Sequence, residues 1–273
     1  MITCEVHHEA SDRERAITQQ IEENAPELAD VVEKVTGLPL PDLVVIRVMD
    51  RTSLLSAATA HLERLLISQI KEHDPTSEEI QRARVRLSTA IRVQRATWIA
   101  VLGMTVLSED EVPQMLVSAP AMRHAGGGEL PLVLVAHEPV HFAQEQARPG
   151  LIKQRGSLIG HSDTVSAPDL HAWMEGHAAW AGEQRTMQEF LGRRVRTGRR
   201  SLRRRAFDRT LGVLMRPRMR PVRQRVQFFQ QIWQLTGSTE DINRAWTVPA
   251  LMASNLCQDP QAWLQHARTA SPG

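Results

Sequence analysis

The segment LVLVAHEPVHFAQEQ, residues 132–146, constrains the fold more than any other part of the sequence. His137 and His141 lie four residues apart, and Glu138 directly follows the first histidine, which gives the pattern H-E-x-x-H. On an α-helix, residues four apart lie on one face, so both imidazoles can reach the same metal ion. Glu138 lies about 100° round the helix from His137, within reach of a metal-bound water. The apolar residues on both sides of the motif favour a half-buried helix.

This spacing suits zinc hydrolysis, in which two ligands and a base come from one rigid element. The zinc lowers the pKa of its water, Glu138 takes the proton, and the resulting hydroxide attacks a polarised carbonyl. The alternative interpretation is chance. With eleven histidines in the chain, an accidental H-E-x-x-H is expected in roughly a few per cent of such sequences.

A third protein ligand is needed to hold one zinc ion and leave a coordination position open. The metzincin extension is absent, because Gln144 and Ala147 stand where Gly and His are required. The helical-looking segment DLHAWMEGHAAWAGEQ, residues 169–184, provides Glu175 beside small residues that permit close helix approach. Glu175 is the preferred third ligand and His177 the second choice.

Two further histidines, His161 and His171, are weaker candidates for the third ligand. For His171 and His177, an imidazole at the surface or at the edge of the core is an equally good interpretation. A transition-state donor is a further possible role for His177.

The motif H-E-P-x-H followed by Phe-Ala-Gln, then E-G-H-A-x-W, resembles a group of largely uncharacterised bacterial zinc metallopeptidase-like proteins of the gluzincin class. The tail FFQQIWQLTGSTEDINRAWTVPALMASNLCQDPQAW is similar to the C-terminal segment of such proteins, so the resemblance covers roughly residues 130–265. It implies one Zn²⁺ held by His137, His141 and Glu175. It also implies that Glu138 is the general base for hydrolysis of a peptide or protein substrate.

Three features depart from a well-formed peptidase of that class. Pro139 has no N–H and removes the bond to the carbonyl of Val135, which costs about 3 kcal/mol in a helix interior. The resemblance implies a local kink there, because proline is usual at this position in those proteins. The chain contains no tyrosine, so only histidine, arginine or backbone groups can stabilise an oxyanion. Ala179 stands where thermolysin-like enzymes have an aspartate that orients a histidine, so the orienting partner is not identified.

The hydrophobic pattern predicts an α+β protein that is mainly helical. We expect helices over residues 12–36, 53–73 and 78–95, a strand over 43–49, and a β pair from residues 97–107 and 111–119. Pro131 suits the first turn of the H-E-x-x-H helix, and helices follow to the C-terminus, with interruptions at 150–163 and 215–221. Together with this pattern, the resemblance implies a zincin- or gluzincin-like fold. Residues 1–130 supply a small sheet beside the active helix, and residues 131–273 form the helical remainder of one compact unit.

Charge is distributed unevenly. Residues 1–50 have a balance of −7, whereas residues 193–225 carry fourteen arginines against Asp208 alone. The arginines allow an alternative function in which a nucleic acid or another anionic partner binds, with any metal serving a structural role. Without an accompanying nucleic-acid motif, a solvated connection between helices is favoured. A peptidase-like scaffold without catalysis is a third possibility.

The location expected from the sequence is the cytoplasm. Residues 96–107 form the longest apolar run, which is too short to span a bilayer. The N-terminus lacks the pattern of a secretion signal. Cys4 and Cys257 are expected to be reduced thiols, because two cysteines cannot form a disulfide framework.

Overall fold

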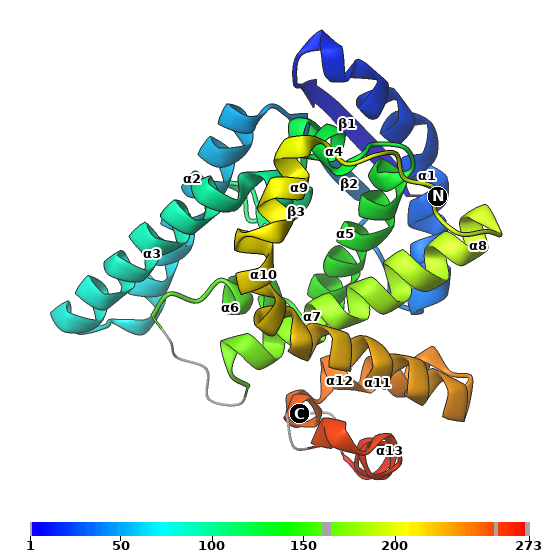
Figure 1. The fold of residues 1–273 in the computed structure, drawn as a ribbon. Helices are drawn as coiled ribbons and strands as arrows, with labels where there is room; N and C mark the ends of the chain where they lie inside the picture. Colours follow the sequence, from blue (N-terminus) through cyan, green and yellow to red (C-terminus); the bar gives the residue numbers. More distant parts are fainter. Residues whose placement is uncertain (1, 160–164, 254–255, 271–273) are drawn as a thin grey trace.

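A four-stranded sheet built from the N-terminal half supports an otherwise helical molecule (Figure 1). The computed structural model describes residues 2–159, 165–253 and 256–270. The strands are Thr3–Glu9 (β1), Leu43–Met49 (β2), Gly103–Leu107 (β3) and Pro113–Ser118 (β4). They lie in the order β1-β2-β4-β3, with β1, β2 and β4 parallel and β3 antiparallel to β4.

The longer helices are Arg15–Thr36 (α1), Arg51–His73 (α2), Ser77–Thr97 (α3), Leu130–Ala147 (α5), Ala167–Ala178 (α7) and Arg220–Thr236 (α11). Shorter α-helices are Ala119–Ala125 (α4), Leu151–Arg155 (α6), Met187–Leu191 (α8), Leu202–Arg209 (α9), Leu211–Met215 (α10), Thr239–Thr247 (α12) and Pro260–Thr269 (α13). Trp98–Ala100 (η2) and Arg216–Met219 (η4) are 3₁₀ turns, and Ala179–Thr186 (η3) is a π-helix. Asp12–Glu14 (η1), Pro249–Met252 (η5) and Leu256–Gln258 (η6) are further 3₁₀ turns.

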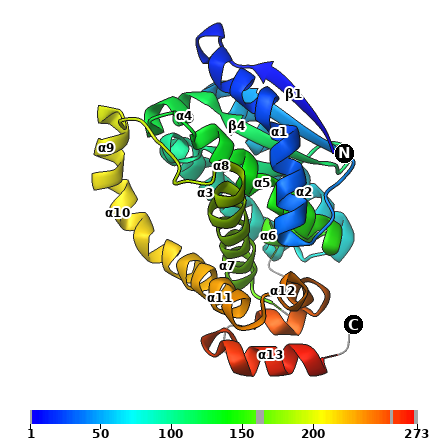
Figure 2. The ribbon, with the colours of Figure 1, turned by 90° about the vertical axis from the view of Figure 1, so that its right-hand side faces the viewer.

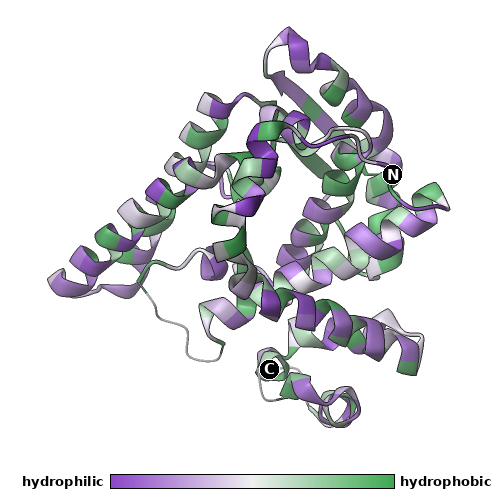
Figure 3. Cartoon of the chain, in the orientation of Figure 1, coloured by the Kyte–Doolittle hydropathy of each residue, from purple (hydrophilic) through white to green (hydrophobic). Residues whose placement is uncertain are grey.

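Side chains of the sheet alternate between two apolar layers, as the pleat requires. Ile46 and Met115 face the main core under α1 and α5, whereas Met49 and Leu116 face α2 on the other side. The main core also includes residues of α7, α11 and α13, and Figure 2 shows α11 and α13 below the sheet layer. In Figure 3, hydrophobic and hydrophilic residues alternate along α11, as expected for a helix with one buried face.

The predicted class is confirmed: the structure is α+β and mainly helical, and its small sheet comes from the N-terminal half. The strand over 43–49 and the long helices lie where they were predicted. The β pair also forms, although its first strand begins at Gly103 because α3 and η2 extend to Ala100. The edge strand β1 was not predicted. Every residue of its polar sequence TCEVHHE is exposed or half-buried, so the strand lacks a buried apolar face. Its partner β2 is also remote in the chain.

The other edge strand, β3, has its backbone bound by side chains from two helices. His61 accepts from the Leu107 amide at 3.2 Å, and Arg64 donates to the Leu107 carbonyl at 2.8 Å. Arg155 of α6 reaches the Thr105 carbonyl at 3.5 Å. These contacts cover part of an edge that would otherwise present unpaired backbone groups.

Candidate metal centre

His137 and His141 lie on α5, as predicted, with their side chains turned toward α7. The helix runs without interruption from Leu130 to Ala147, and Pro131 lies in its first turn. Pro139 is buried well inside this helix, so it costs the backbone one hydrogen bond without ending the element. The helix start is too far from Pro139 to reduce that cost.

Glu175 of α7 meets the two histidines from the facing helix. Its Oε2 lies 3.4 Å from His137 Nε2, and its Oε1 lies 3.6 Å from His141 Nε2. The ligand atoms that the three residues offer all lie within 4.8 Å of one another. The predicted triad is therefore brought together by tertiary structure, across two helices that are about 30 residues apart in sequence.

Glu138 lies beside this triad and is held by the sheet. Thr105 of β3 donates its hydroxyl to Glu138 Oε2 at 2.8 Å. Glu138 is only 5% exposed, and burial raises the pKa of its carboxyl above the ordinary value. A carboxylate whose proton affinity is raised in this way is suited to accept a proton from water.

The residues around the triad favour positive charge at its centre. Burial by itself lowers the pKa of His137, but Glu175 and Glu183 outweigh burial and hold that pKa well above its ordinary value. Burial likewise opposes ionisation of Glu175, yet His137, His141 and Arg155 keep its pKa well below the ordinary range. Burial lowers the pKa of His141 to about 3, so its imidazole is neutral and able to bind a metal. This donor set and its charge fit a divalent cation.

A second carboxylate contacts His137 at ion-pair distance, without the alignment of a hydrogen bond. Glu183 Oε1 lies 2.9 Å from His137 Nδ1, on the ring side opposite Glu175. In a continuous α-helix, Glu183 would be turned about 80° away from Glu175. The π-helix η3 has more residues per turn, so Glu183 comes round toward α5. Glu183 thus lies where it can replace the histidine-orienting aspartate of thermolysin-like enzymes, a position at which this sequence has Ala179.

Gln144 orients the other histidine. Its Oε1 lies 2.9 Å from His141 Nδ1, and its amide nitrogen contacts the Met174 carbonyl and His177 Nδ1, each at 3.1 Å. This arrangement leaves His141 Nε2 to face Glu175. A polar residue three positions after a helical histidine is detectable in sequence, because the two share a face.

The structure does not bring His177 to the triad. Its ring is fully buried between Trp180, Phe229 and Trp246, and Gln144 separates it from His141. Its Nε2 has no hydrogen-bond partner among the described residues. The His177 imidazole therefore cannot contact a substrate bound at the triad directly, contrary to the predicted role of a transition-state donor.

Two other basic groups lie next to Glu175. Arg155 donates to Glu175 Oε1 at 3.0 Å, and His171 Nδ1 lies 3.8 Å from the same atom. The side chain of His171 is half exposed, whereas that of Arg155 is mostly covered. His161, the other weak candidate, lies outside the described residues. Sequence patterns did not indicate Arg155 or Thr105, because neither belongs to the segments that carry the motif.

His137 and Glu175 of the triad line a cleft of about 310 Å³. Its polar side is made by His137, Glu138, Glu175 and Glu183. Its apolar side is made by Ala100, Leu102, Gly103, Leu130, Val133 and Leu134. A ligand with an apolar side chain and a carbonyl group therefore has complementary surroundings beside Glu138.

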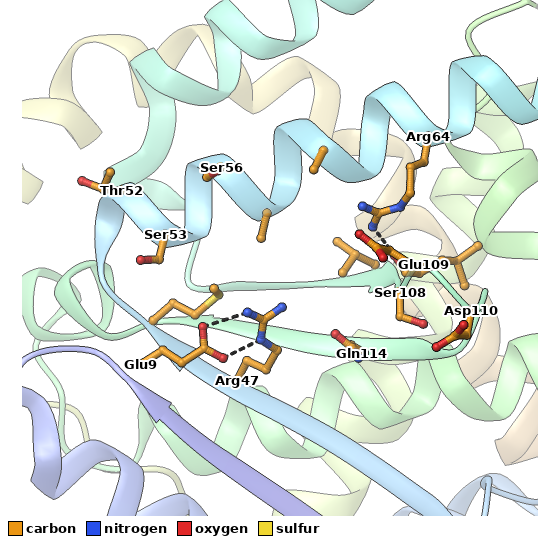
Figure 4. A pocket seen from close by; sticks show the side chains of 15 residues that line it. Glu9, Arg47, Thr52, Ser53, Ser56, Arg64, Ser108, Glu109, Asp110 and Gln114 are labelled. Carbon is orange, nitrogen blue, oxygen red and sulfur yellow. Dashed lines mark hydrogen bonds and ion pairs between the residues drawn. The ribbon is translucent and has the colours of Figure 1, made fainter.

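A larger hollow of about 720 Å³ lies on the α2 face of the sheet, away from the triad (Figure 4). Its two arginines already have partners: Arg47 binds Glu9 at 2.6 and 2.8 Å, and Arg64 binds the Leu107 carbonyl. The hollow contains no histidine or cysteine.

Comparisons of the chain with models of known families, with curated proteins and with solved structures found no match. The functional assignment therefore depends on the geometry of these residues. Among the described residues, no helix is long and apolar enough to cross a membrane.

Proposed function

We propose that this chain is a zinc-dependent metallopeptidase of gluzincin type, acting on a peptide or protein substrate. The observation that carries the proposal is the convergence of His137 Nε2, His141 Nε2 and the Glu175 carboxylate beside a buried fourth residue, Glu138. Two histidines and one carboxylate are the ligand set of thermolysin-type zinc sites. A cytoplasmic location belongs to the same proposal, with Cys4 and Cys257 as free thiols.

The chain's own residues divide the work of hydrolysis. Zinc, when bound, supplies an acidified water and a Lewis acid for the substrate carbonyl. Glu138 accepts the proton of the attacking water and transfers it to the leaving amine. Thr105 keeps the Glu138 carboxylate in place through its hydroxyl. Gln144 holds the His141 ring through a hydrogen bond, and Glu183 forms an ion pair with His137, so that both Nε2 atoms face Glu175.

The oxyanion needs a donor other than tyrosine. Arg155 and His171 are the basic side chains that lie beside Glu175, and His171 is the more exposed of the two. We assign transition-state stabilisation to this pair in place of His177. His177 instead supports Gln144 from within the aromatic cluster.

Glu138→Gln tests catalysis separately from metal binding. The variant keeps the shape of the side chain and both histidines but removes the proton acceptor. We expect zinc content to remain near one per chain while hydrolysis of a peptide library falls by about 10²–10⁴-fold. Elemental analysis and a peptide cleavage assay measure the two quantities.

The double variant His137→Ala/His141→Ala is the matching control, and it should lose zinc as well as activity. If wild type and Glu138→Gln were equally inactive on broad peptide libraries, the protein would be a metal-binding scaffold without catalysis. If the double variant kept its zinc, the assignment of His137 and His141 as metal ligands would be wrong.

A further inference from the structure

An arginine-rich segment joins the two walls of the metal cleft. We name residues 193–219 the arginine strap; it comprises a stretch of coil, α9, α10 and η4. Its first part contacts α4 and η2, and η2 contributes Ala100 to one wall of the cleft. It continues into α11, which packs against α7, the helix that carries Glu175 of the opposite wall. Figures 1 and 2 both show α9 and α10 along the outside of the molecule between α4 and α11.

The first half of the strap is fixed by specific contacts. Arg193 forms an ion pair with Glu129 at the start of α5, and Gly198 donates its amide to the Gly126 carbonyl at 3.2 Å. Arg204 donates to the Ile99 carbonyl at 2.8 Å, next to the cleft residue Ala100. The strap is therefore held at the rim of the cleft.

Several of the arginines whose side chains the structure describes do not take part in this anchoring. Arg200 binds Asp208, which the anchoring residue Arg204 also contacts. Arg194, Arg199, Arg203 and Arg209 are exposed and have no ion pair within the described part of the chain. Unpaired guanidinium groups on a segment that is anchored next to the cleft wall attract an anionic ligand.

Exposed apolar side chains are interspersed with these arginines. Leu202 is 76% exposed, and Leu211 and Val213 are each 42% exposed. The strap therefore offers both positive charge and apolar contact. Its one aromatic side chain, Phe207, is partly buried, so no exposed ring is available for stacking on nucleic-acid bases.

We propose that the arginine strap is the substrate-recognition site of the proposed peptidase. It holds an extended polypeptide in which a run of Asp and Glu flanks an apolar residue. The acidic run lies along the strap, and the apolar side chain enters the cleft against Leu102, Val133 and Leu134. The carboxylates in the cleft, Glu175 and Glu183, disfavour entry of the acidic run itself. This inference rests on the proposed function for its catalytic part, but its binding part can be tested alone.

The test uses the full-length Glu138→Gln protein and a fluorescein-labelled peptide that carries one leucine followed by a glutamate run. Binding is measured by fluorescence anisotropy at increasing salt. The strap variant adds Arg199→Gln, Arg203→Gln and Arg209→Gln, exposed positions without ion pairs. We expect Kd to rise by about tenfold in the strap variant and also with added salt.

The control variant, Arg84→Gln, Arg92→Gln and Arg95→Gln, removes the same charge from exposed positions of α3. It should leave Kd unchanged. Equal weakening by both triple variants would overturn the proposal, because net charge alone would explain the binding. Tighter binding of a DNA duplex, an RNA strand or anionic vesicles than of the peptide, at the same salt, would also overturn it.

Hydrolysis distinguishes failure of this inference from failure of the proposed function. With Glu138 restored, kcat/KM of the strap variant should fall about tenfold for the acidic peptide and stay unchanged for a short uncharged peptide. If both peptides were cleaved equally by the strap variant and wild type, the strap proposal would fail while the peptidase proposal stood. If neither were cleaved but the strap still bound the acidic peptide, the strap would be a binding site and the peptidase proposal would fail.

Discussion

Gln144 connects His141, a ligand of the proposed metal site, to the hydrophobic interior. It accepts from His141 and contacts His177, whose ring is enclosed by aromatic side chains. Because this glutamine is completely buried, it cannot exchange these partners for water. The orientation of the His141 ring is therefore set by packing around α7 as well as by α5 itself.

Replacing Gln144 should weaken the metal site without removing a ligand. For Gln144→Leu we expect zinc affinity to fall by about 10–100-fold, because the His141 ring loses its orienting acceptor. Competition with a chromophoric chelator measures this change. Gln146→Leu, an exposed position on the same helix, should have no effect, and equal affinity in both variants would contradict the role of Gln144.

His61 is a buried neutral histidine between α2 and β3. Burial first, then the charges of Arg64 and Arg155, lower its pKa from 6.5 to about 4. The unfolded chain therefore binds more protons than the folded chain between these two pH values. Its contribution to stability is complete above pH 6.5 and is lost as the pH falls toward about 4.

We expect His61→Asn to make stability less dependent on pH. At pH 5, protonation of the unfolded state should cost the wild type about 2 kcal/mol through His61, a loss that the variant does not have. Urea unfolding at neutral pH and at pH 5 measures the difference. His266→Asn, at an exposed position, should keep the pH dependence of the wild type. An unchanged slope for His61→Asn would show that this histidine does not titrate as described.

At the scale of elements, the metal centre depends on a close contact between α5 and the π-helix η3. Gly182 lies against the backbone of Ala136, and a Cβ at this position would overlap the Ala136 carbonyl oxygen. The backbone of η3 can approach α5 only because residue 182 has no side chain. This approach brings Glu183 to His137.

Gly182→Ala should therefore separate the two elements. We expect a loss of about 1–3 kcal/mol in the free energy of unfolding, because Ala136 is backbone that cannot move aside. Zinc affinity should fall as well, since Glu183 moves away from His137. Chemical denaturation and chelator competition provide the measurements. Gly212→Ala, where an added Cβ would be 3.2 Å from the Phe207 carbonyl oxygen and less crowded than at position 182, should cost less stability, and an equal cost at both positions would refute the close contact.

On the scale of the whole molecule, the metal centre joins parts that are distant in the chain. Thr105 comes from the sheet, His137 and His141 from α5, and Glu175 from α7. A cation bound to His137, His141 and Glu175 would connect α5 with α7, and the unfolded chain does not preserve this arrangement. Metal binding should therefore stabilise the native state.

Removal of zinc should lower thermal stability. At a free zinc concentration of about 100 times Kd, the linkage contributes about 2.7 kcal/mol. For a chain of this size we expect a chelator to lower Tm by about 5 °C. Differential scanning calorimetry measures the shift. The His137→Ala/His141→Ala protein should show no response to the chelator, and an equal response would place the stabilising metal elsewhere.

Local patterns in the sequence were enough to predict the long helices, β2 and the helix face that carries His137 and His141. Helical and strand periodicity act over a few residues, so they can be detected without knowing the fold. The polar edge strand β1 was missed because its pairing with β2 depends on residues about 40 positions away. Glu175 was found from a motif, although its approach to the histidines required the packing of α7 on α5.

The sequence by itself determined the donor types and the helical spacing of the candidate site. Tertiary structure alone decided which groups support it: Thr105, Arg155, Gln144 and Glu183 reach the site from four different elements. It also placed His177 among aromatic rings, away from the triad, because residues two apart on a helix lie on different faces. The physical reason is that helical spacing fixes directions within one element, whereas contacts between elements depend on how closely their backbones pack.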